Sequence, residues 1–151
     1  MMRVSVAQRA YIAGFIEGEG SFCLTRPMRK KQGVPQYHYQ IRPSISVSQK
    51  NKRPLEFIQK IYGGRIRYVK HTGVNATFLW FYDLRTRQGI LRLITDIYPF
   101  LIASRTRYRA ACVYKLAQLL GVGKYLGNQR LPQENLDKRE KIYSLWSRSR
   151  R

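Results

Sequence analysis

Apolar and polar residues follow two different rhythms along this chain, and the changes between them divide it into helices and strands. Over residues 6–16, apolar side chains recur at helical spacing, and glycines at positions 18 and 20 end the pattern. Residues 22–28 are typical of a strand, and a basic segment over 29–35 with the composition of a turn follows. The chain is therefore predicted to begin with a helix that leads into a strand.

Residues 37–49 show the clearest strand pattern in the sequence. Residues of one parity are mostly apolar and those of the other are polar, so one face is expected on a core and the other in solvent. Pro43 cannot donate a ladder hydrogen bond, which predicts a sheet edge or a bulge at that point. The apolar parity consists of Tyr37, Tyr39, Ile41, Ile45 and Val47.

The remaining elements complete a mixed α and β pattern. Residues 53–64 are predicted to form a short helix that begins near Pro54 and ends at glycine. Residues 65–71 and 76–84 are typical of a hairpin. Three further helices are predicted over residues 86–97, 105–120 and 132–147. The order α-β-β-α-β-β-α-α-α predicts an α+β domain, with one four-stranded sheet and its helices on one face.

The charge of the chain narrows the range of its partners. It has 29 Lys and Arg against 8 Asp and Glu, a net charge of +21, while 44% of its 151 residues are hydrophobic. We expect a single folded domain over residues 1–151, with the final helix docked on it and a basic tail over roughly 132–151. Such a charge requires a polyanion, for which nucleic acid is the first candidate and an anionic membrane surface the second.

Two features indicate where the protein works. No apolar stretch approaches the roughly 20 residues of a membrane span, and no signal-peptide pattern precedes Tyr11, so neither membrane insertion nor secretion is expected. Cys23 and Cys112 lie far apart and lack metal-ligand spacing, which is typical of reduced thiols in an intracellular protein.

The polar face of the predicted sheet carries side chains of the types that read bases. In the major groove, arginine pairs with guanine and glutamine with adenine, and serine and threonine contact either. In so basic a chain, this composition favours nucleic-acid contact over the alternative of an ordinary solvated face. The candidate DNA-binding residues are Thr25, Arg29, His38, Gln40, Arg42, Ser44, Ser46, Ser48, Arg65 and Arg67.

The end of the first helix raises a separate question, because two of the chain's few acids, Glu17 and Glu19, lie there. Carboxylates are disfavoured near the negative end of a helix dipole. Glu19 is either a surface carboxylate paired with a basic residue, or it forms an oxygen site with the last carbonyls of the helix for a hard cation such as Mg²⁺. Gly14 and Gly18, four residues apart, either admit a second helix or pack the first helix tightly on its own sheet.

Residues 12–22, with the sequence IAGFIEGEGSF, resemble the signature motif of the LAGLIDADG homing endonucleases. Residues 46–50 (SVSQK) are similar to the end of that family's second strand, and residues 98–120 to its later segment with basic active-site residues. The resemblance implies the LAGLIDADG homing-endonuclease fold, with an α-β-β-α-β-β-α core and a four-stranded antiparallel DNA-binding sheet. The chain departs from the family name in carrying glutamate, where the name has aspartate, at both acidic positions.

The resemblance also implies roles for individual residues. Glu19, the last acid of the motif, is expected to bind a divalent metal, with Mg²⁺ as the expected ion and the Gly18 carbonyl as an additional ligand. Gln49 matches a polar residue that positions water near the metal, and either Arg105 or Arg107 matches a basic active-site residue. Single-motif members act as homodimers, so residues 12–20 are expected to form the dimer interface through Ala13, Gly14, Glu17 and Gly18.

The activity that the resemblance implies is site-specific, metal-assisted hydrolysis of double-stranded DNA at a long, roughly palindromic site, as in intron homing. Two alternatives stay open: an RNA-binding intron maturase with vestigial acids, and a DNA-binding module without nuclease activity. In each case the protein is expected inside the cell with its nucleic acid, in the cytoplasm, nucleoid or an organelle, and without a membrane partner.

Overall fold

The computed structural model of the chain describes residues 3–26, 41–70, 77–120 and 132–150. Three candidate DNA-binding residues, Arg29, His38 and Gln40, lie outside these residues, as does the part of the expected second strand before Ile41.

The described helices and strands follow the predicted order. Their bounds agree with the predicted ones within a few residues, and a short 3-10 turn after α3 is an addition. The elements are α1 (Val6–Glu19), β1 (Gly20–Thr25), β2 (Arg42–Gln49), α2 (Arg53–Tyr62), β3 (Arg65–Lys70), β4 (Phe78–Leu84), α3 (Arg87–Ile97), η2 (Tyr98–Phe100), α4 (Ser104–Leu119) and α5 (Gln133–Arg148).

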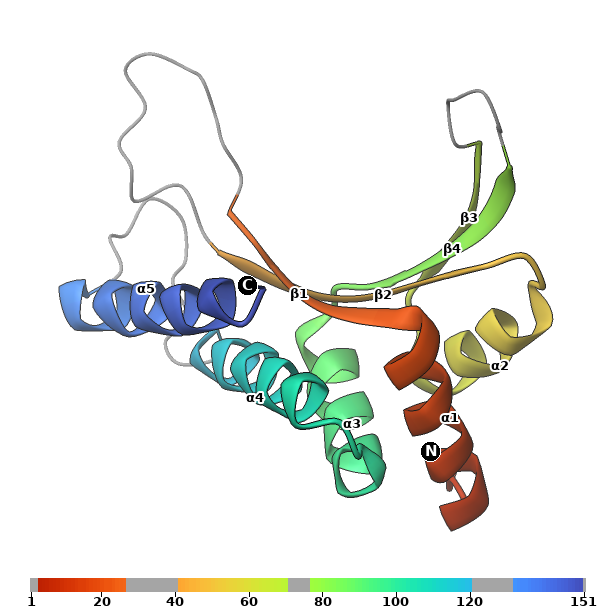
Figure 1. Cartoon of the computed structure of the whole chain (residues 1–151). Helices are drawn as coiled ribbons and strands as arrows, with labels where there is room; N and C mark the ends of the chain where they lie inside the picture. Colours follow the sequence, from red (N-terminus) through yellow and green to blue (C-terminus); the bar gives the residue numbers. More distant parts are fainter. Residues whose placement is uncertain (1–2, 27–40, 71–76, 121–131, 151) are drawn as a thin grey trace.

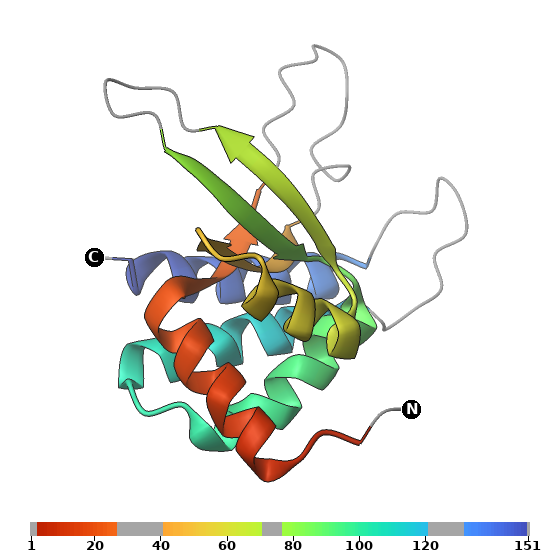
Figure 2. The ribbon, with the colours of Figure 1, turned by 90° about the vertical axis from the view of Figure 1, so that its right-hand side faces the viewer.

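The four strands form one antiparallel sheet in the order β1-β2-β4-β3. Figures 1 and 2 show the helices beneath this sheet, which is bent so that its opposite, concave face carries no helix. The predicted α+β architecture, with helices on one face, is therefore confirmed.

The side chains between the sheet and the helices are the apolar parity of each strand. Phe22 and Leu24 of β1 are buried, as are Ile45 and Val47 of β2. They pack in one core with buried residues of all five helices, among them Ile12, Ile16, Leu55, Ile58, Ile90, Leu93, Val113, Leu116 and Trp146. Pro43 fits the predicted edge position, because it pairs with Leu24 of β1 and the pairing of β2 with β4 begins only at Ile45.

The junction of α1 and β1 is tighter than the sequence pattern predicts. The strand begins at Gly20, directly after the helix ends at Glu19, and the Gly20 N–H donates to the Ile16 carbonyl. A Cβ at position 20 would lie 2.8 Å from that carbonyl oxygen, so only glycine allows the chain to pass from helix to strand without a loop. At the other end of α1, Ser5 and Gln8 form a reciprocal capping box.

Two glycines make the turn from α2 into β3. Gly63 and Gly64 have φ values of 78° and 95°, in the left-handed region that other residues rarely adopt. The Tyr82 hydroxyl donates to the Gly63 carbonyl at 2.9 Å, and a Cβ at position 64 would lie 2.7 Å from the Tyr82 ring. This contact fixes β3 beside β4 and so places Arg65 at the start of the strand.

The last helix docks on the sheet, as expected. Trp146 is buried and its indole Nε1–H donates to the Phe22 carbonyl at 2.9 Å. Arg26, just after β1, pairs with Glu140 and lies 4.5 Å from the centre of the Tyr143 ring. Within the described parts of the chain, no helix is both long and apolar enough to cross a membrane.

Candidate nucleic-acid interface and metal site

The concave sheet face collects the polar candidates that the structure describes. Residues directly opposite in neighbouring antiparallel strands share a face. The register pairs Thr25 with Arg42, and it places Asp83 of β4 between Ser46 of β2 and Arg65 of β3. By the same rule this face holds all seven described candidates, namely Thr25, Arg42, Ser44, Ser46, Ser48, Arg65 and Arg67.

The arrangement of charge on this face was not predicted. Arg42 opens β2, the strand that also carries the serines, and Arg65 and Arg67 lie on the outer strand β3, with β4 between the two strands. Two residues of β4 modify it: Phe81, whose ring lies 4.7 Å from the Arg67 guanidinium, and Asp83, which pairs with Arg85. Phe81 and Asp83 have the same parity along β4, so they must share a face. The sequence does not show which face, because apolar and aromatic residues occupy both parities of this strand.

Glu19 lies where α1 meets the sheet. It is the last residue of the helix, it is exposed, and the next residue opens β1. Gly18 beside it is also exposed. Because Gly20 pairs with Val47, the strand register brings the end of β2 to the same junction, and Gln49 lies there, half-buried, with its side-chain oxygen accepting the Lys50 N–H at 2.9 Å.

Glu17 has a different place from Glu19. Its carboxylate accepts the Ala103 N–H at 2.8 Å and the Ile102 N–H at 3.0 Å, at the start of α4. The acid therefore satisfies orphan donors at a helix N-terminus of its own chain, where negative charge is favourable. The side chain of Glu17 is thus engaged within the subunit, and its place in the dimer interface stays a prediction.

We expect Glu17→Ala to lower the free energy of unfolding by about 1–2 kcal/mol, because two N–H groups lose a charged acceptor. Urea or thermal unfolding measures it. The matched control is Glu134→Ala, which removes only an exposed ion pair with Lys138 on α5 and should change stability by less than about 0.5 kcal/mol. Equal stability of the Glu17 variant and the native protein would contradict this role.

The two helical glycines face outward. Gly14 and Gly18 are exposed, and a Cβ built on either meets no atom within 4 Å. Tight packing of this glycine pair on the chain's own sheet is therefore wrong. Ala13 is 0% exposed and packs in the core of its own subunit, while its place in the dimer interface stays a prediction. Each glycine costs a helix about 1 kcal/mol relative to alanine, and no contact within the described chain compensates for it.

The outward face of α1 is also apolar. Val6 is 65% exposed and Tyr11 50%, and the Tyr11 ring stacks on Phe15 with centroids 6.1 Å apart. Ile102, whose own backbone N–H donates to Glu17, is 86% exposed. The glycine pair thus lies on a helix that exposes large hydrophobic side chains.

The structure separates the two candidate arginines. Arg107 is half-buried, and its Nη1 donates to the Leu101 carbonyl at 2.9 Å and to the Tyr98 carbonyl at 3.3 Å, which ties η2 to α4. Arg105 is exposed, and its Nη2 donates to the Arg150 carbonyl at 3.0 Å. These contacts give Arg107 a structural task and leave Arg105 at the surface.

Arg109, which the sequence analysis did not single out, lies close to Arg105. Burial lowers the pKa of its guanidinium most, Cys23 opposes this shift, and the charges of Arg105 and Arg150 add smaller lowering effects. Its guanidinium lies 5.3 Å from the centre of the Trp146 ring, and that of Arg150 5.6 Å. Arg105 and Arg109 of α4 therefore lie near Arg150, which follows α5. Only the packing of α5 on α4 reveals this group of three cations.

Among the described residues, no group of three or more His, Cys, Asp or Glu side chains converges as a metal cluster. The junction of α1 and β1 offers the Glu19 carboxylate and the backbone carbonyls of the last helical turn. All of these donors are oxygens, the type that Mg²⁺ and Ca²⁺ prefer.

The chain thus combines an α+β fold, a concave antiparallel sheet face with three arginines, and an exposed acid at the end of the first helix. The profile described as LAGLIDADG endonuclease matches residues 12–107. The chain therefore belongs to the LAGLIDADG endonuclease family, and the resemblance noted in the sequence is confirmed.

Solved structures agree with this assignment. The archaeal intron-encoded homing endonuclease I-Vdi141I, complexed with DNA, matches with a TM-score of 0.70 at 23% identity, over 95% of this chain and 84% of that chain. I-CvuI, in complex with its target and 2 mM Ca, gives 0.65 at 20% identity, over 93% and 82%. The group I intron-encoded I-CeuI, complexed with DNA, gives 0.67 at 19% identity, over 99% and 69%. No curated protein matches the chain.

Proposed function

We propose that the protein is a site-specific homing endonuclease that hydrolyses both strands of duplex DNA at a long, roughly palindromic target. The observation that carries this proposal is the concave sheet face, where Arg42 and a row of serines on β2 share one surface with Arg65 and Arg67 on β3, beside the exposed Glu19. Membership of the endonuclease family and the similar structures complexed with DNA support it.

The sheet face accounts for binding and for base selection. A curved antiparallel sheet follows the major groove, where arginine and serine side chains reach base edges. Its surplus of arginine, against the single acid Asp83 among the described residues of β3 and β4, adds phosphate attraction that depends on salt. The sequence read by the protein depends further on DNA shape.

Glu19 is proposed as the metal ligand, with the Gly18 carbonyl beside it. Both are exposed oxygen donors at the negative end of α1, so the residues present fit a hard divalent cation, and Mg²⁺ is the proposed ion. When bound, such an ion polarises a phosphate oxygen and activates water as a nucleophile. The glutamate carboxylate holds charge at this point without taking part as a nucleophile itself.

Arg105 and Gln49 are proposed as the accompanying groups. The positive charge of the Arg105 guanidinium suits it to stabilise the charge that develops on the phosphate. Arg107 is not proposed for this role, because its donors hold the carbonyls of Tyr98 and Leu101. Gln49, at the end of β2, is suited to orient water beside Glu19 through its amide group.

A homodimer would place one Glu19 at each strand of the target. Gly14 and Gly18 face outward with space for a second helix backbone, which supports pairing of α1 with its copy around a twofold axis. Two chains would then contribute two sheet faces, which is the arrangement that a palindromic site requires.

The decisive experiment is cleavage of a plasmid that carries the joined flanks of the intron that encodes the protein. With Mg²⁺ we expect linear DNA cut at one position, and with EDTA intact DNA. A plasmid in which the intron still separates the two flanks is the matched control and should stay uncut. If purified dimer binds the joined flanks but leaves them intact over a range of divalent ions, the nuclease proposal is wrong and a binding module takes its place.

A further inference from the structure

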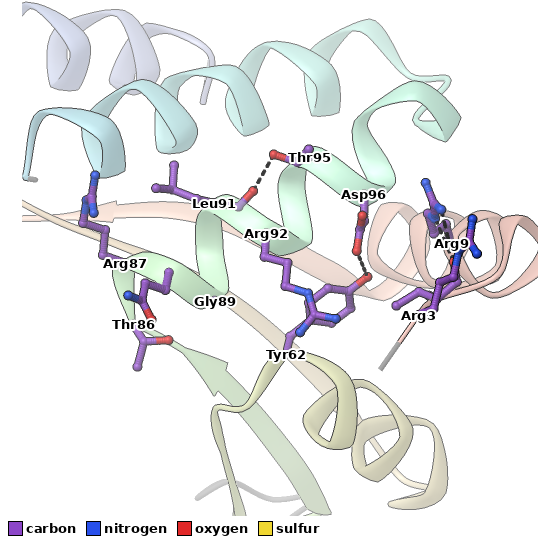
Figure 3. Close-up of a pocket in the computed structure, with 12 residues that line it drawn as sticks. Arg3, Arg9, Tyr62, Thr86, Arg87, Gly89, Leu91, Arg92, Thr95 and Asp96 are labelled. Carbon is purple, nitrogen blue, oxygen red and sulfur yellow. Dashed lines mark hydrogen bonds between the residues drawn. The ribbon is translucent and has the colours of Figure 1, made fainter. Parts of the chain in front are cut away.

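A hollow of about 1170 Å³ lies in the helical layer, away from the concave sheet face. Its walls come from the start of α1, the end of α2 and the length of α3, as Figure 3 shows. Four arginines line it, Arg3, Arg9, Arg87 and Arg92, and we refer to it as the arginine-lined hollow. The function proposed above makes no use of it.

Two of these arginines, Arg9 and Arg87, donate hydrogen bonds to backbone carbonyls, which carry no net charge. Arg9 donates to the Val4 carbonyl through Nε at 3.2 Å and Nη2 at 3.1 Å. Arg87 donates through Nε to the Ala117 carbonyl at 3.0 Å, at the end of α4. These contacts fix the two side chains without neutralising their charge.

The middle of the hollow is built in the same way. Arg92 donates through Nη1 to the Ile61 carbonyl at 3.0 Å and lies 5.5 Å from the centre of the Tyr62 ring. Asp96 is the one carboxylate among the lining residues, and it accepts the Tyr62 hydroxyl at 2.9 Å. Four guanidiniums against one carboxylate make the arginine-lined hollow strongly cationic.

The chemistry of this lining selects phosphate. A guanidinium presents several N–H donors in a plane, which match phosphate oxygens in pairs. In Figure 3 the arginines are spread along the hollow rather than gathered at one point, with Arg87 at one end, Arg92 in the middle and Arg3 and Arg9 at the other end. Such spacing suits a ligand with successive phosphates better than a single anion.

The shape of the hollow selects unpaired nucleotides. A DNA duplex is read by elements that project into its grooves, and a hollow offers it none. Unstacked nucleotides, by contrast, are bound in pockets that combine cations with apolar and aromatic surface. Leu91 supplies apolar surface here, while Tyr62 and Val4 line the hollow but are each only 5% exposed, and the volume is close to that of pockets that hold small organic ligands, roughly 300–1,000 Å³.

We propose that the arginine-lined hollow is a second nucleic-acid site, which binds the phosphates of an unpaired strand while the sheet face binds duplex. The two sites lie in different layers of the molecule, so a duplex on the sheet does not cover the hollow. The inference does not depend on DNA cleavage and would hold for an inactive protein. Unpaired RNA and unpaired DNA share the phosphate chemistry, and the experiment distinguishes them.

The experiment measures anisotropy of short, labelled, unstructured RNA and DNA oligonucleotides of one sequence, and of the matching duplex, over a range of salt. The test variant is Arg3→Gln/Arg87→Gln, and the control is Lys60→Gln/Lys141→Gln, which removes equal charge from exposed positions on α2 and α5. We expect the test variant to weaken single-strand binding about tenfold. It should also lower the salt slope by about 1.4, since each phosphate contact contributes roughly 0.7.

The outcomes separate the proposal from general charge attraction. Duplex binding should be nearly equal for test and control variants, while Arg65→Gln/Arg67→Gln should weaken the duplex and spare the single strand. A preference for RNA over DNA would show that the 2′-hydroxyl is read, and equal affinity that phosphates alone are read. The proposal is overturned if test and control variants lose single-strand affinity equally, or if only the sheet variant loses it.

Stability needs its own check, because Arg87 also ties α3 to the end of α4. Thermal unfolding of each variant therefore accompanies the binding data. Arg3→Gln alone, at an exposed position ahead of α1, keeps the test decisive if the double variant unfolds. It should lower the single-strand salt slope by about 0.7, and no change in that slope would contradict the proposal.

Discussion

Glu19→Gln is expected to abolish DNA cleavage while fold and DNA binding remain. The substitution keeps the size of the side chain and removes the negative charge that the proposed metal site needs. Glu19 is exposed at the end of α1 and no core contact depends on it. Loss of the ion's contribution to the transition state, several kcal/mol, corresponds to a fall in rate of about 10³-fold or more.

The measurement is single-turnover cleavage of the joined-flank plasmid under Mg²⁺, together with the affinity for the same DNA under Ca²⁺. Glu134→Gln is the matched control, since it removes an exposed glutamate on α5 and should cut at the native rate. Glu17→Gln provides a sharper comparison. Glu17 lies two residues from Glu19, but its carboxylate accepts backbone N–H groups at the start of α4. Native cleavage by Glu19→Gln would remove Glu19 from the metal site.

The order of helices and strands could be predicted because each element has its own period. Residues 42–49 alternate strictly, and Ile45 and Val47 are buried as this alternation requires. Strand ends were harder, since β1 begins at Gly20 rather than at Phe22. The reason is a contact between the Gly20 N–H and the Ile16 carbonyl, which no sequence period encodes.

The candidate site was predicted in its parts but not in its contacts. The motif distinguished Glu19 from Glu17, yet only the fold shows that Glu17 binds the backbone at Ile102 and Ala103, 85 and 86 residues away in sequence. Long-range packing also gives Arg105 and Arg107 different hydrogen-bond partners and places Arg109 beside Arg105. Spacing along one helix cannot reveal a partner on another.

The location of the arginine-lined hollow could not be predicted from the sequence either. Its arginines lie before α1, within α1 and along α3, and in the sequence they are indistinguishable from the other basic residues of a chain with a net charge of +21. What distinguishes them is their common location, together with the backbone carbonyls that Arg9, Arg87 and Arg92 bind. Composition therefore predicted the class of ligand, while the location of a second site required the packing of three helices.

Gly14→Leu is expected to break the proposed homodimer and leave each subunit folded. A side chain at position 14 meets nothing within 4 Å inside the chain, and removing a glycine favours the helix by roughly 1 kcal/mol. Across a twofold axis the new side chain enters a close helix contact twice. Overpacking costs about 1–3 kcal/mol at each place, so the dimer should weaken by about 10²-fold or more.

Sedimentation measures the association, and plasmid cleavage measures its consequence, since one subunit offers only one Glu19. Ser144→Leu is the matched control, because it adds a leucine at an exposed position of α5. That control should stay dimeric, whereas the Gly14 variant should be a monomer that still unfolds in one cooperative transition, without the stabilisation that subunit association adds. A stable dimer of the Gly14 variant would mean that the subunits meet elsewhere, and the outward glycine pair would then need another explanation.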